Sequence, residues 1–312
     1  MLKIHHHPAS LAGLRSPVVT AGTFDGVHLG HREIIRRLKT RAEEFDGESL
    51  LLTFDPHPRI ALKKDDDRLR LLNTNEEKAA LLDELGLGHL LIIPFTTDFA
   101  KQTQQEFVES FLVSQLHIRH LVVGFNHRFG AGRQGDFESL RSFAGRFGFT
   151  VEQVERKDED QLTVSSTQIR NAIASGDLAA ANRMLGAPYR MIAEVIHGRN
   201  DGHKLGFPTA NLKPDHPFKL LPANGVYAVK VRIGIHWFEG MCNVGIRPTF
   251  GGTEVITEVN IFNFDASLYG QRIMVSFIDK LRDERRFNSM EELVTQLHID
   301  RQQAIERLKP QH

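Results

Sequence analysis

The pattern of hydrophobic positions changes its period once along the chain. Up to about Leu185, short apolar runs alternate with segments in which apolar residues recur every three to four positions. The runs that predict buried strands are the one starting at Val18, Ser49–Phe54, Leu90–Ile93, Leu121–Gly124 and Thr150–Val154. The segments that predict helices are the one starting after Gly30, Asn75–Leu85, Gln104–Gln115, Phe137–Arg146 and Leu178–Leu185. This alternation predicts an α/β domain with a doubly wound, Rossmann-like parallel sheet.

Beyond Gly186 the period becomes two, and turn residues separate the apolar runs. The strands predicted there are Met191–Ile196, Gly225–Ile233, Trp237–Val244, Glu254–Asn263 and Ile273–Asp279. Successive strands without helices between them predict an antiparallel β-barrel, and Met290–Lys309 predicts a closing helix. Because Gly186 and Pro188 end the preceding helix, we expect two domains, 1–185 and 186–312.

Composition narrows the class of protein. A chain of 312 residues is long enough to bury two hydrophobic cores. Its 39 basic and 39 acidic residues give a formal net charge of zero. The balance gives no support to nucleic-acid or anionic-membrane binding. Neither a signal-like segment nor an apolar run of spanning length is present, and the single cysteine, Cys242, excludes an internal disulfide. We therefore expect a cytoplasmic protein in which Cys242 and Trp237 pack within strands.

The segment GTFDGVHLGH joins the first strand to the first helix. In open α/β sheets such a turn lies at the carboxyl end of a strand, where ligands bind. Gly22, Gly26 and Gly30 would let the backbone approach a phosphate, and the helix N-terminus favours negative charge. His28 and His31 flank Gly30 and could donate hydrogen bonds to a phosphate group. The alternative is a surface turn that happens to carry two histidines.

Three further loops of the first domain carry candidate residues. His57 follows the second strand in a proline-bounded turn, and the loop Phe125–Gly130 brings Asn126 and an arginine to a strand end. In Val164–Arg170, hydroxyl groups followed by Arg170 could bind nucleotide phosphates. Taken singly, these segments are equally explained as a turn histidine, a solvated loop and a capped helix.

The second domain contains the loop GRNDGHKLGFPTANL, residues 198–212. Its glycines make it accessible to phosphate, and Thr209 and Asn211 offer neutral oxygen ligands suited to Mg²⁺. Glu258, on a predicted strand, is chemically suited to act as a general base in phosphoryl transfer. The alternative for Glu258 is a half-exposed strand residue paired with a neighbouring base.

These motifs together resemble the bacterial bifunctional riboflavin kinase/FAD synthetase family. GTFDGVHLGH, TFDPHP, NTNEEK, VVGFNHRFGAGRQGD and VSSTQIR resemble its FAD synthetase module. LGFPTAN, NVGIRPTF and the strand with Glu258 resemble its riboflavin kinase module, and the motifs follow the family's order over nearly the whole chain. The chain departs from the family pattern at Phe125, His127 and His203.

The resemblance implies phosphorylation of riboflavin to FMN by the C-terminal domain and adenylylation of FMN to FAD by the N-terminal domain, with Mg²⁺ and ATP. It implies catalytic roles for Glu258, His28 and His31, and Mg²⁺ ligands at Thr209 and Asn211. Adenylyltransferase nucleotide contacts would be Gly22, Phe24, Gly26, His28, His31, His57, Asn126, Ser165, Ser166, Thr167 and Arg170. Kinase nucleotide contacts would be Gly198, Gly202, His203, Lys204, Gly206, Pro208, Thr209 and Asn211. Flavin contacts would be Arg282, Phe287 and Asn126.

Two alternatives stay open from the sequence. One is a nucleotidyltransferase with a single activity and another phosphate ester as acceptor, which would leave LGFPTAN and Glu258 without a purpose. The other is a flavin or nucleotide sensor without catalysis, which would not need His28, His31 and Glu258 together. We expect small-molecule partners only, and a monomer or weak homo-oligomer.

Overall fold

The computed structural model describes residues 1–63, 69–155, 158–159, 162–198, 202, 205–249 and 252–309. The chain forms two compact units. Unit 1 comprises Met1–Leu69 and Lys78–Ser165, and unit 2 comprises Arg70–Glu77 and Ser166–His312. The domain boundary expected after Leu185 stays a prediction.

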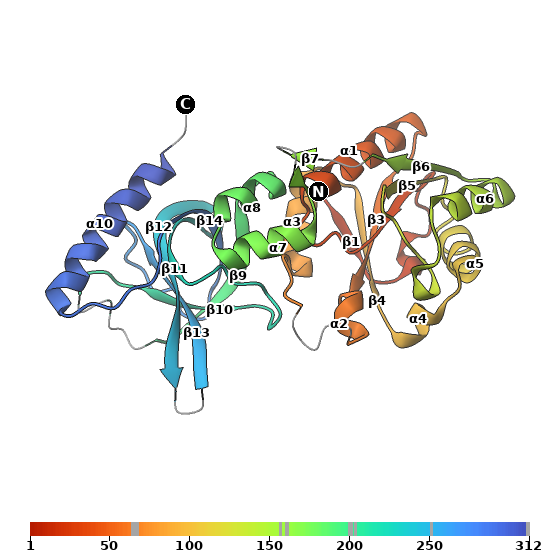
Figure 1. Ribbon diagram of the computed structural model, residues 1–312. Helices are drawn as coiled ribbons and strands as arrows, with labels where there is room; N and C mark the ends of the chain where they lie inside the picture. The colour runs from red at the N-terminus through yellow and green to blue at the C-terminus, as the bar shows by residue number, and fades with distance from the viewer. Residues whose placement is uncertain are drawn as a thin grey trace. The chain divides into compact units, whose positions relative to one another are not determined.

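Unit 1 is built on a six-stranded parallel sheet (Figure 1). Its strands are β1 (Lys3–His5), β2 (Val18–Ala21), β3 (Ser49–Asp55), β4 (His89–Pro94), β5 (His120–Gly124) and β6 (Thr150–Val154). Their order in the sheet is β1-β4-β3-β2-β5-β6. From β2 the chain winds outward first through β3 and β4, then returns to the other side for β5 and β6. The order therefore reverses between β2 and β5.

Helices cover both faces of this sheet because alternate strand residues are apolar on both sides. Val19, Leu50 and Leu121 face one core with η2 (Phe107–Val113) and α6 (Phe137–Phe147). Val18, Leu51 and Val122 face another core with α1 (Leu29–Glu44) and the apolar part of α3 (Asn75–Glu84). The remaining elements are short: η1 (Pro8–Leu11), α2 (Pro58–Ala61), α4 (Thr97–Lys101), α5 (Gln104–Glu106), η3 (Ala131–Arg133), β7 (Asp158–Glu159) and β8 (Leu162–Thr163).

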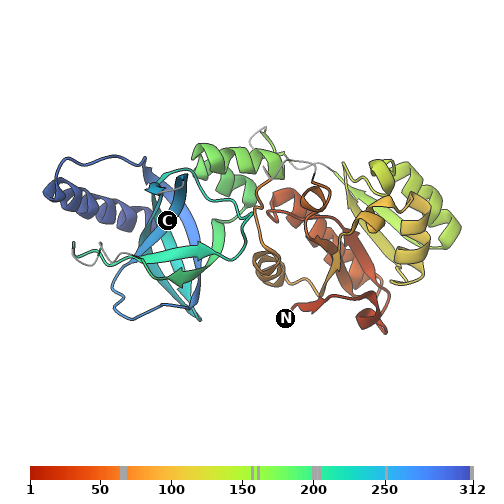
Figure 2. The same ribbon diagram turned by 90° about the horizontal axis from the view of Figure 1, so that it is seen from below.

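Unit 2 contains a closed antiparallel barrel with the strand order β10-β13-β12-β11-β14-β9. Its strands are β9 (Tyr189–Ile196), β10 (Ala210–Pro214), β11 (Gly225–Ile233), β12 (His236–Thr249), β13 (Gly252–Ile261) and β14 (Arg272–Arg282). Helices α7 (Ser166–Ser175) and α8 (Leu178–Leu185) precede the barrel in the chain. The last helix, α10 (Met290–Leu308), lies on the outside of the barrel (Figures 1 and 2).

Residues 70–77 belong to unit 2 although they are distant from it in sequence. Lys219 Nζ donates to the Glu77 carboxylate at 2.6 Å and to Leu72 O at 2.7 Å, and both charged side chains are buried. The other Glu77 oxygen accepts from Ile192 N at 2.7 Å. Because a buried charge is stable only when it is paired and hydrogen-bonded, these contacts hold the segment against the barrel.

The predicted fold class is confirmed: a Rossmann-like sheet, an antiparallel barrel and a closing helix. Strands β1 and β10 were not predicted as strands. The predicted helix Gln104–Gln115 is instead the short α5 followed by the wider turns of η2. Cys242 is fully buried, as expected, whereas Trp237 is 47% exposed, so its prediction as a packed strand residue is wrong. It lies near the end of the β11–β12 hairpin, where the Arg232 guanidinium lies 5.9 Å from its ring centre.

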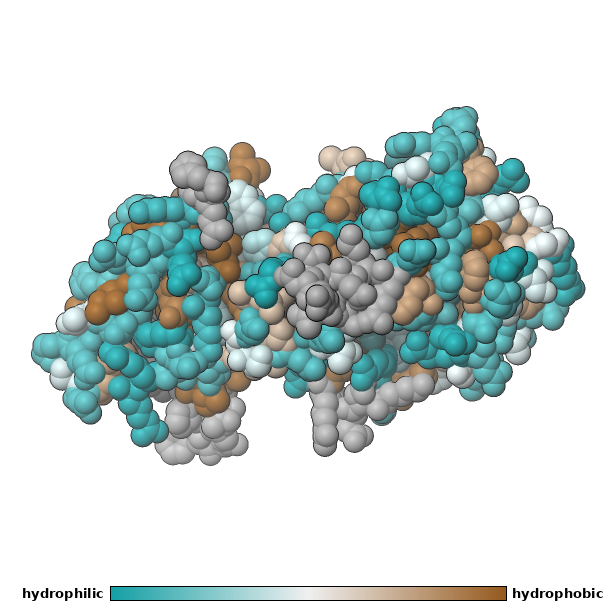
Figure 3. All heavy atoms as spheres, turned by 45° about the horizontal axis from the view of Figure 1, so that its top comes forward, coloured by the Kyte–Doolittle hydropathy of each residue, from teal (hydrophilic) through white to brown (hydrophobic). Residues whose placement is uncertain are grey.

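Among the described residues, no helix is both long and apolar enough to cross a bilayer. On the face drawn in Figure 3, hydrophilic residues predominate, and the hydrophobic ones form small separate groups.

Candidate active sites

The turn after β2 lies where the strand order of the unit 1 sheet reverses. In open α/β sheets the crevice at this point is the usual ligand site. The turn has a strained backbone: Phe24 and Val27 have φ values of 46° and 42°, beside Gly26 at 96°. A β-branched residue with positive φ is a genuine outlier, and such strain is concentrated at functional sites. Phe24 and Val27 tolerate it because both side chains are buried in the core beside α1.

His28 and His31 meet at the start of α1. His28 is the N-cap residue, and its Nδ1 accepts a hydrogen bond from His31 N at 3.3 Å. The two rings stack with centroids 3.6 Å apart and an interplanar angle of 16°, and Phe24 packs on His31 at 4.8 Å. Because Nδ1 of His28 is an acceptor, this bond assigns the proton of its neutral ring to Nε2.

His31 lies in an environment that disfavours its protonation. Burial lowers its pKa well below the usual value, and the nearby His28 and Lys78 lower the pKa further. Its Nδ1 is buried and has no hydrogen-bond partner among the described residues. A buried ring nitrogen without a protein partner is costly, so His31 Nδ1 is a candidate atom for contact with a ligand.

Lys78 is a residue of this region that the sequence analysis did not single out, although it ends the motif NTNEEK. Its side chain is buried, and Nζ donates to Thr53 Oγ1 at 3.1 Å. Burial lowers its pKa to about 8, although Asp25 and Asp55 act in the opposite direction. Apart from that motif, the sequence shows only a charged residue in the first turn of a predicted helix.

Two further strand-end loops of unit 1 carry predicted contacts. His57, after β3, caps α2 by accepting from Arg59 N at 3.2 Å. Asn126 is exposed in the loop after β5, next to β2 in the sheet. In the same loop, burial lowers the pKa of His127 to about 4, with Arg133 contributing to the shift. Asn126 thus follows the strand next to β2, the strand whose following turn carries the histidine pair, and the lowered pKa keeps His127 neutral at pH 7.

The predicted phosphate contacts of VSSTQIR are divided between the units. Ser165 ends unit 1, whereas Ser166, Thr167 and Arg170 lie on α7 in unit 2. Arg170 Nε donates to Arg70 O at 2.7 Å within unit 2. Arg170 is thus bonded to a segment far away in the sequence, and the nucleotide contacts of these residues stay predictions.

In unit 2 the barrel register aligns three polar residues. Asn211 on β10 is opposite Glu258 on β13, and Glu258 is opposite Asn243 on β12. Directly opposite residues of antiparallel strands project from the same face, with strands about 4.8 Å apart. Burial, and secondly the negative charge of Glu258, raise the pKa of the Cys242 thiol on the neighbouring position. Cys242, next to Asn243 on β12, is therefore a neutral thiol.

The glycine loop closes tightly on the predicted magnesium ligands. A Cβ atom at Gly198 would overlap the Asn211 amide, and one at Gly202 would overlap Phe207 O and lie 3.1 Å from Thr209 Oγ1. These glycines therefore leave a space that larger residues would fill, beside one hydroxyl and one amide oxygen. Such a neutral, oxygen-bearing set fits Mg²⁺ that brings waters and a nucleotide with it.

Gly206 and Asn260 also determine the conformation of this loop. Gly206 has φ of 77°, a conformation that glycine adopts readily. Asn260, which the sequence analysis missed, donates from Nδ2 to Pro208 O at 2.7 Å and holds the start of the PTAN segment. His203 and Lys204, both predicted nucleotide contacts, lie outside the described residues.

Arg282, a predicted flavin contact, is held by α10. Its Nε and Nη2 donate to the two Asp300 oxygens at 2.8 and 2.7 Å, and its guanidinium lies 5.7 Å from the Phe287 ring centre. Asp300 is fully buried and also accepts from Gln296 at 2.7 Å. In the barrel register Arg282 is opposite Val226, which is opposite Asn243. Arg282 thus lies two strands from Asn243, in the register row that contains Glu258.

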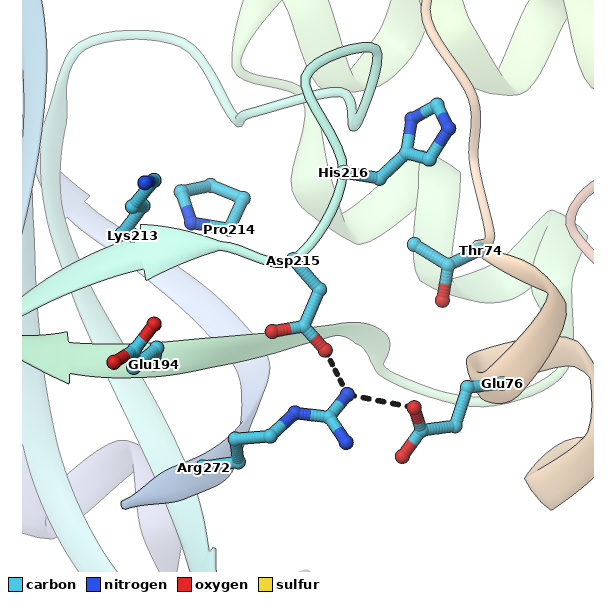
Figure 4. Close-up of a pocket in the computed structure, with 8 residues that line it drawn as sticks. All are labelled: Thr74, Glu76, Glu194, Lys213, Pro214, Asp215, His216 and Arg272. Atoms are coloured by element: carbon cyan, nitrogen blue, oxygen red, sulfur yellow. Dashed lines mark hydrogen bonds and ion pairs between the residues drawn. The ribbon is translucent and has the colours of Figure 1, made fainter. Parts of the chain in front are cut away.

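A surface cavity of about 450 Å³ lies elsewhere in unit 2 (Figure 4). Arg272 bridges two carboxylates there, bonding Asp215 and lying 2.6 Å from Glu76. These partners raise its pKa above the usual value. The lining contains no residue predicted for either site: Thr74, Glu76, Glu194, Lys213, Pro214, Asp215, His216 and Arg272.

Comparison with known proteins matches two family models to this chain. The model described as FAD synthetase matches residues 12–168, and the one described as riboflavin kinase matches residues 185–308. A curated relative from Haemophilus influenzae is 38% identical over 288 residues, 92% of each chain. One from Pseudomonas fluorescens is 39% identical over 287 residues, 92% of this chain and 91% of the relative. Both are named bifunctional riboflavin kinase/FMN adenylyltransferase.

The whole fold also matches a solved structure. A crystal structure from Streptococcus pneumoniae, described as a macrolide-efflux protein, superimposes with a TM-score of 0.87 and 32% identity. The match covers 97% of this chain and 98% of that one. The architecture of both units is therefore shared over the full length.

Proposed function

Because the chain belongs to the bifunctional riboflavin kinase/FMN adenylyltransferase family, we propose that each of its two reactions uses one of the two polar clusters described above. The protein is a transferase that makes FMN from riboflavin and ATP, and FAD from FMN and ATP. We assign adenylyl transfer to residues 1–185 and phosphorylation to residues 186–312. The compact units differ from this division by grouping α7 and α8 with the barrel.

For adenylyl transfer, the observation that supports the assignment is the stacked His28–His31 pair at the amino end of α1. An oxygen of the FMN phosphate attacks the α-phosphorus of ATP, and the bond to pyrophosphate breaks. The FMN phosphate is already a nucleophile, so the residues need only position it and stabilise charge. Gly22, Gly26 and the N-terminus of α1 would bind phosphate, and Asn126 would contact nucleotide or flavin.

For phosphorylation, the observation that supports the assignment is the register row Asn211–Glu258–Asn243. A riboflavin hydroxyl attacks the γ-phosphorus of ATP, its proton passes to Glu258, and ADP leaves. Thr209 and Asn211 would hold Mg²⁺, which when bound neutralises charge on the ATP phosphates. Arg282, fixed by Asp300, and Phe287 would line the flavin position.

A chromatographic time course tests the assignment of both reactions. Purified protein is incubated with riboflavin, ATP and Mg²⁺, and FMN and FAD are measured over time. We expect FMN to rise and then fall as FAD accumulates. FMN that accumulates without FAD would refute adenylyl transfer in this chain and direct attention to the loop Phe125–Gly130. No product from riboflavin or from added FMN would leave the alternative of a non-catalytic flavin sensor.

A further inference from the structure

Lys78 is an ionisable residue of unit 1 that no motif role explains. It lies in the first turn of α3, and its side chain is buried at 5% exposure. A lysine is rarely buried unless its ammonium group has a function or a set of partners. The contacts of its nitrogen show where the charge is held.

The ammonium group is fixed at the carboxyl ends of β2 and β3. Lys78 Nζ donates to Thr53 Oγ1 at 3.1 Å, and the Thr53 hydroxyl donates to Thr23 O at 3.2 Å. Thr53 is fully buried on β3, and Thr23 belongs to the GTFDG turn. This chain of hydrogen bonds therefore joins the lysine to the backbone of the turn that carries His28.

The charged and titratable groups that face Lys78 come from each neighbouring element. Asp25, in the turn, and Asp55, at the end of β3, favour its charged form, whereas burial disfavours it. His31, on α1, lies within electrostatic range, and its pKa is lowered partly by Lys78. The net pKa of Lys78 of about 8 leaves most of it protonated at pH 7. At pH 7 the positive charge of the cluster is therefore on Lys78, and the His31 ring is neutral.

We propose that Lys78 is the fixed cation of the adenylyl-transfer site, held by Thr53 so that it stabilises the negative charge of phosphate groups bound at His28 and His31. This inference rests on the proposed function of unit 1. A preorganised cation in a water-poor site stabilises developing phosphate charge far more than it would in bulk water. The neutral His31, whose Nδ1 has no partner among the described residues, can then bond a ligand without like-charge repulsion between two cations.

The test compares Lys78→Met and Lys78→Arg with wild type in conversion of FMN to FAD. Lys78→Met removes the charge at similar length, and we expect the adenylyl-transfer rate to fall about 100-fold, the usual effect of losing one such donor. Lys78→Arg keeps a cation and should recover part of the rate. Lys39→Met is the matched control, because Lys39 Nζ bonds Leu85 O at 2.8 Å in the same unit, away from the strand-end turns. It should keep the wild-type rate.

Two readouts separate this role from a merely structural one. The wild-type rate should fall as the pH rises through about 8, where Lys78 loses its proton, and Lys78→Met should lack this limb. By NMR, the His31 pKa should rise in Lys78→Met, since a repelling charge is removed. Riboflavin phosphorylation by the same samples monitors folding of unit 2, including the buried Glu77 next to Lys78.

The proposal is overturned if folded Lys78→Met keeps the wild-type rate and pH profile, or if His31 titrates unchanged. Wild-type protein that fails to make FAD from FMN would instead refute the proposed function of unit 1. A Lys78→Met sample that loses riboflavin phosphorylation as well is misfolded, and Lys78→Arg then provides the test. Because arginine keeps its proton, the rate of this variant should not fall as the pH rises through about 8, and a retained fall would overturn the proposal.

Discussion

Two buried ion pairs of unit 2 differ from the buried bases near the histidine pair of unit 1. In unit 2, Lys219 pairs with Glu77 and Arg282 with Asp300, and each buried carboxylate accepts further hydrogen bonds. In unit 1, burial outweighs the neighbouring carboxylates of Lys78 and leaves its pKa lowered, and His31 is a buried base with lowered pKa.

The difference indicates which buried groups stabilise the fold and which can bind an anionic ligand. Satisfied ion pairs stabilise one geometry, and breaking them leaves an uncompensated charge. Desolvated bases reduce stability but are ready to interact with an anionic ligand. We therefore expect substitutions in unit 2 to lower stability and activity together, and those at the unit 1 bases to lower activity with little loss of stability.

The largest expected effect is the separation of the two activities. Glu258→Ala removes the proposed base, so FMN formation should fall roughly 10²–10⁴-fold, while FAD formation from added FMN continues. His28→Ala combined with His31→Ala should do the reverse. Both are measured by the chromatographic assay. Loss of both activities in either folded variant would contradict two separate sites.

Asp300→Asn tests the ion pairs of unit 2. The change leaves the partly buried Arg282 without its carboxylate, and the free energy of unfolding of this unit should fall by about 3 kcal/mol. The KM for riboflavin should rise because the guanidinium is no longer fixed, whereas adenylyl transfer should stay unchanged. Urea unfolding followed by Trp237 fluorescence measures the first effect.

Asp279→Asn is the control for Asp300→Asn. It removes the 3.1 Å ion pair between half-buried Asp279, on β14, and exposed Arg307, on the same helix as Asp300; this pair should be worth less than about 1 kcal/mol. Equal losses of stability in the two variants would show that burial of the Arg282–Asp300 pair is unimportant.

The smallest expected effect is the pH dependence of unit 1 stability. Because the His31 pKa is lower in the folded protein than its usual 6.5, the unfolded chain takes up the proton first as pH falls. Folded stability should therefore decrease below about pH 6.5, by up to about 1.4 kcal/mol per pH unit from this one group. Hydrogen exchange of α1 along a urea series, at about pH 7.5 and about pH 5.5, measures the change.

His31→Asn should lose this dependence and be no less stable than wild type at the higher pH. His117→Asn is the control, because His117 is exposed and asparagine tolerates its positive φ of 47°. An acid loss of stability that is the same in wild type and His31→Asn would show that His31 does not carry it.

Local pattern determined most of the fold. The apolar runs at β3 and β5 and the period of two in the barrel were sufficient to predict these strands, because each strand buries the face that its sequence makes apolar. The helix predicted to begin at Asn75 does begin there, directly after Thr74, whose hydroxyl accepts from Glu77 N at 3.2 Å. The prediction for Trp237 is wrong because residue type indicates only that tryptophan prefers burial. It does not show that this tryptophan lies next to a hairpin turn, where its side chain is partly exposed.

The sequence by itself determined the two fold classes, the family motifs and the histidine pair, since each depends on neighbouring residues in a short segment. Only the tertiary structure decided which distant groups share one environment. The order of strands brought Thr23, Thr53 and Lys78 together, and the pair of Glu77 with Lys219 assigned residues 70–77 to the barrel unit. The physical reason is that burial and charge change a side chain's pKa through its neighbours in space. The register of strands far apart in sequence determines which side chains become neighbours.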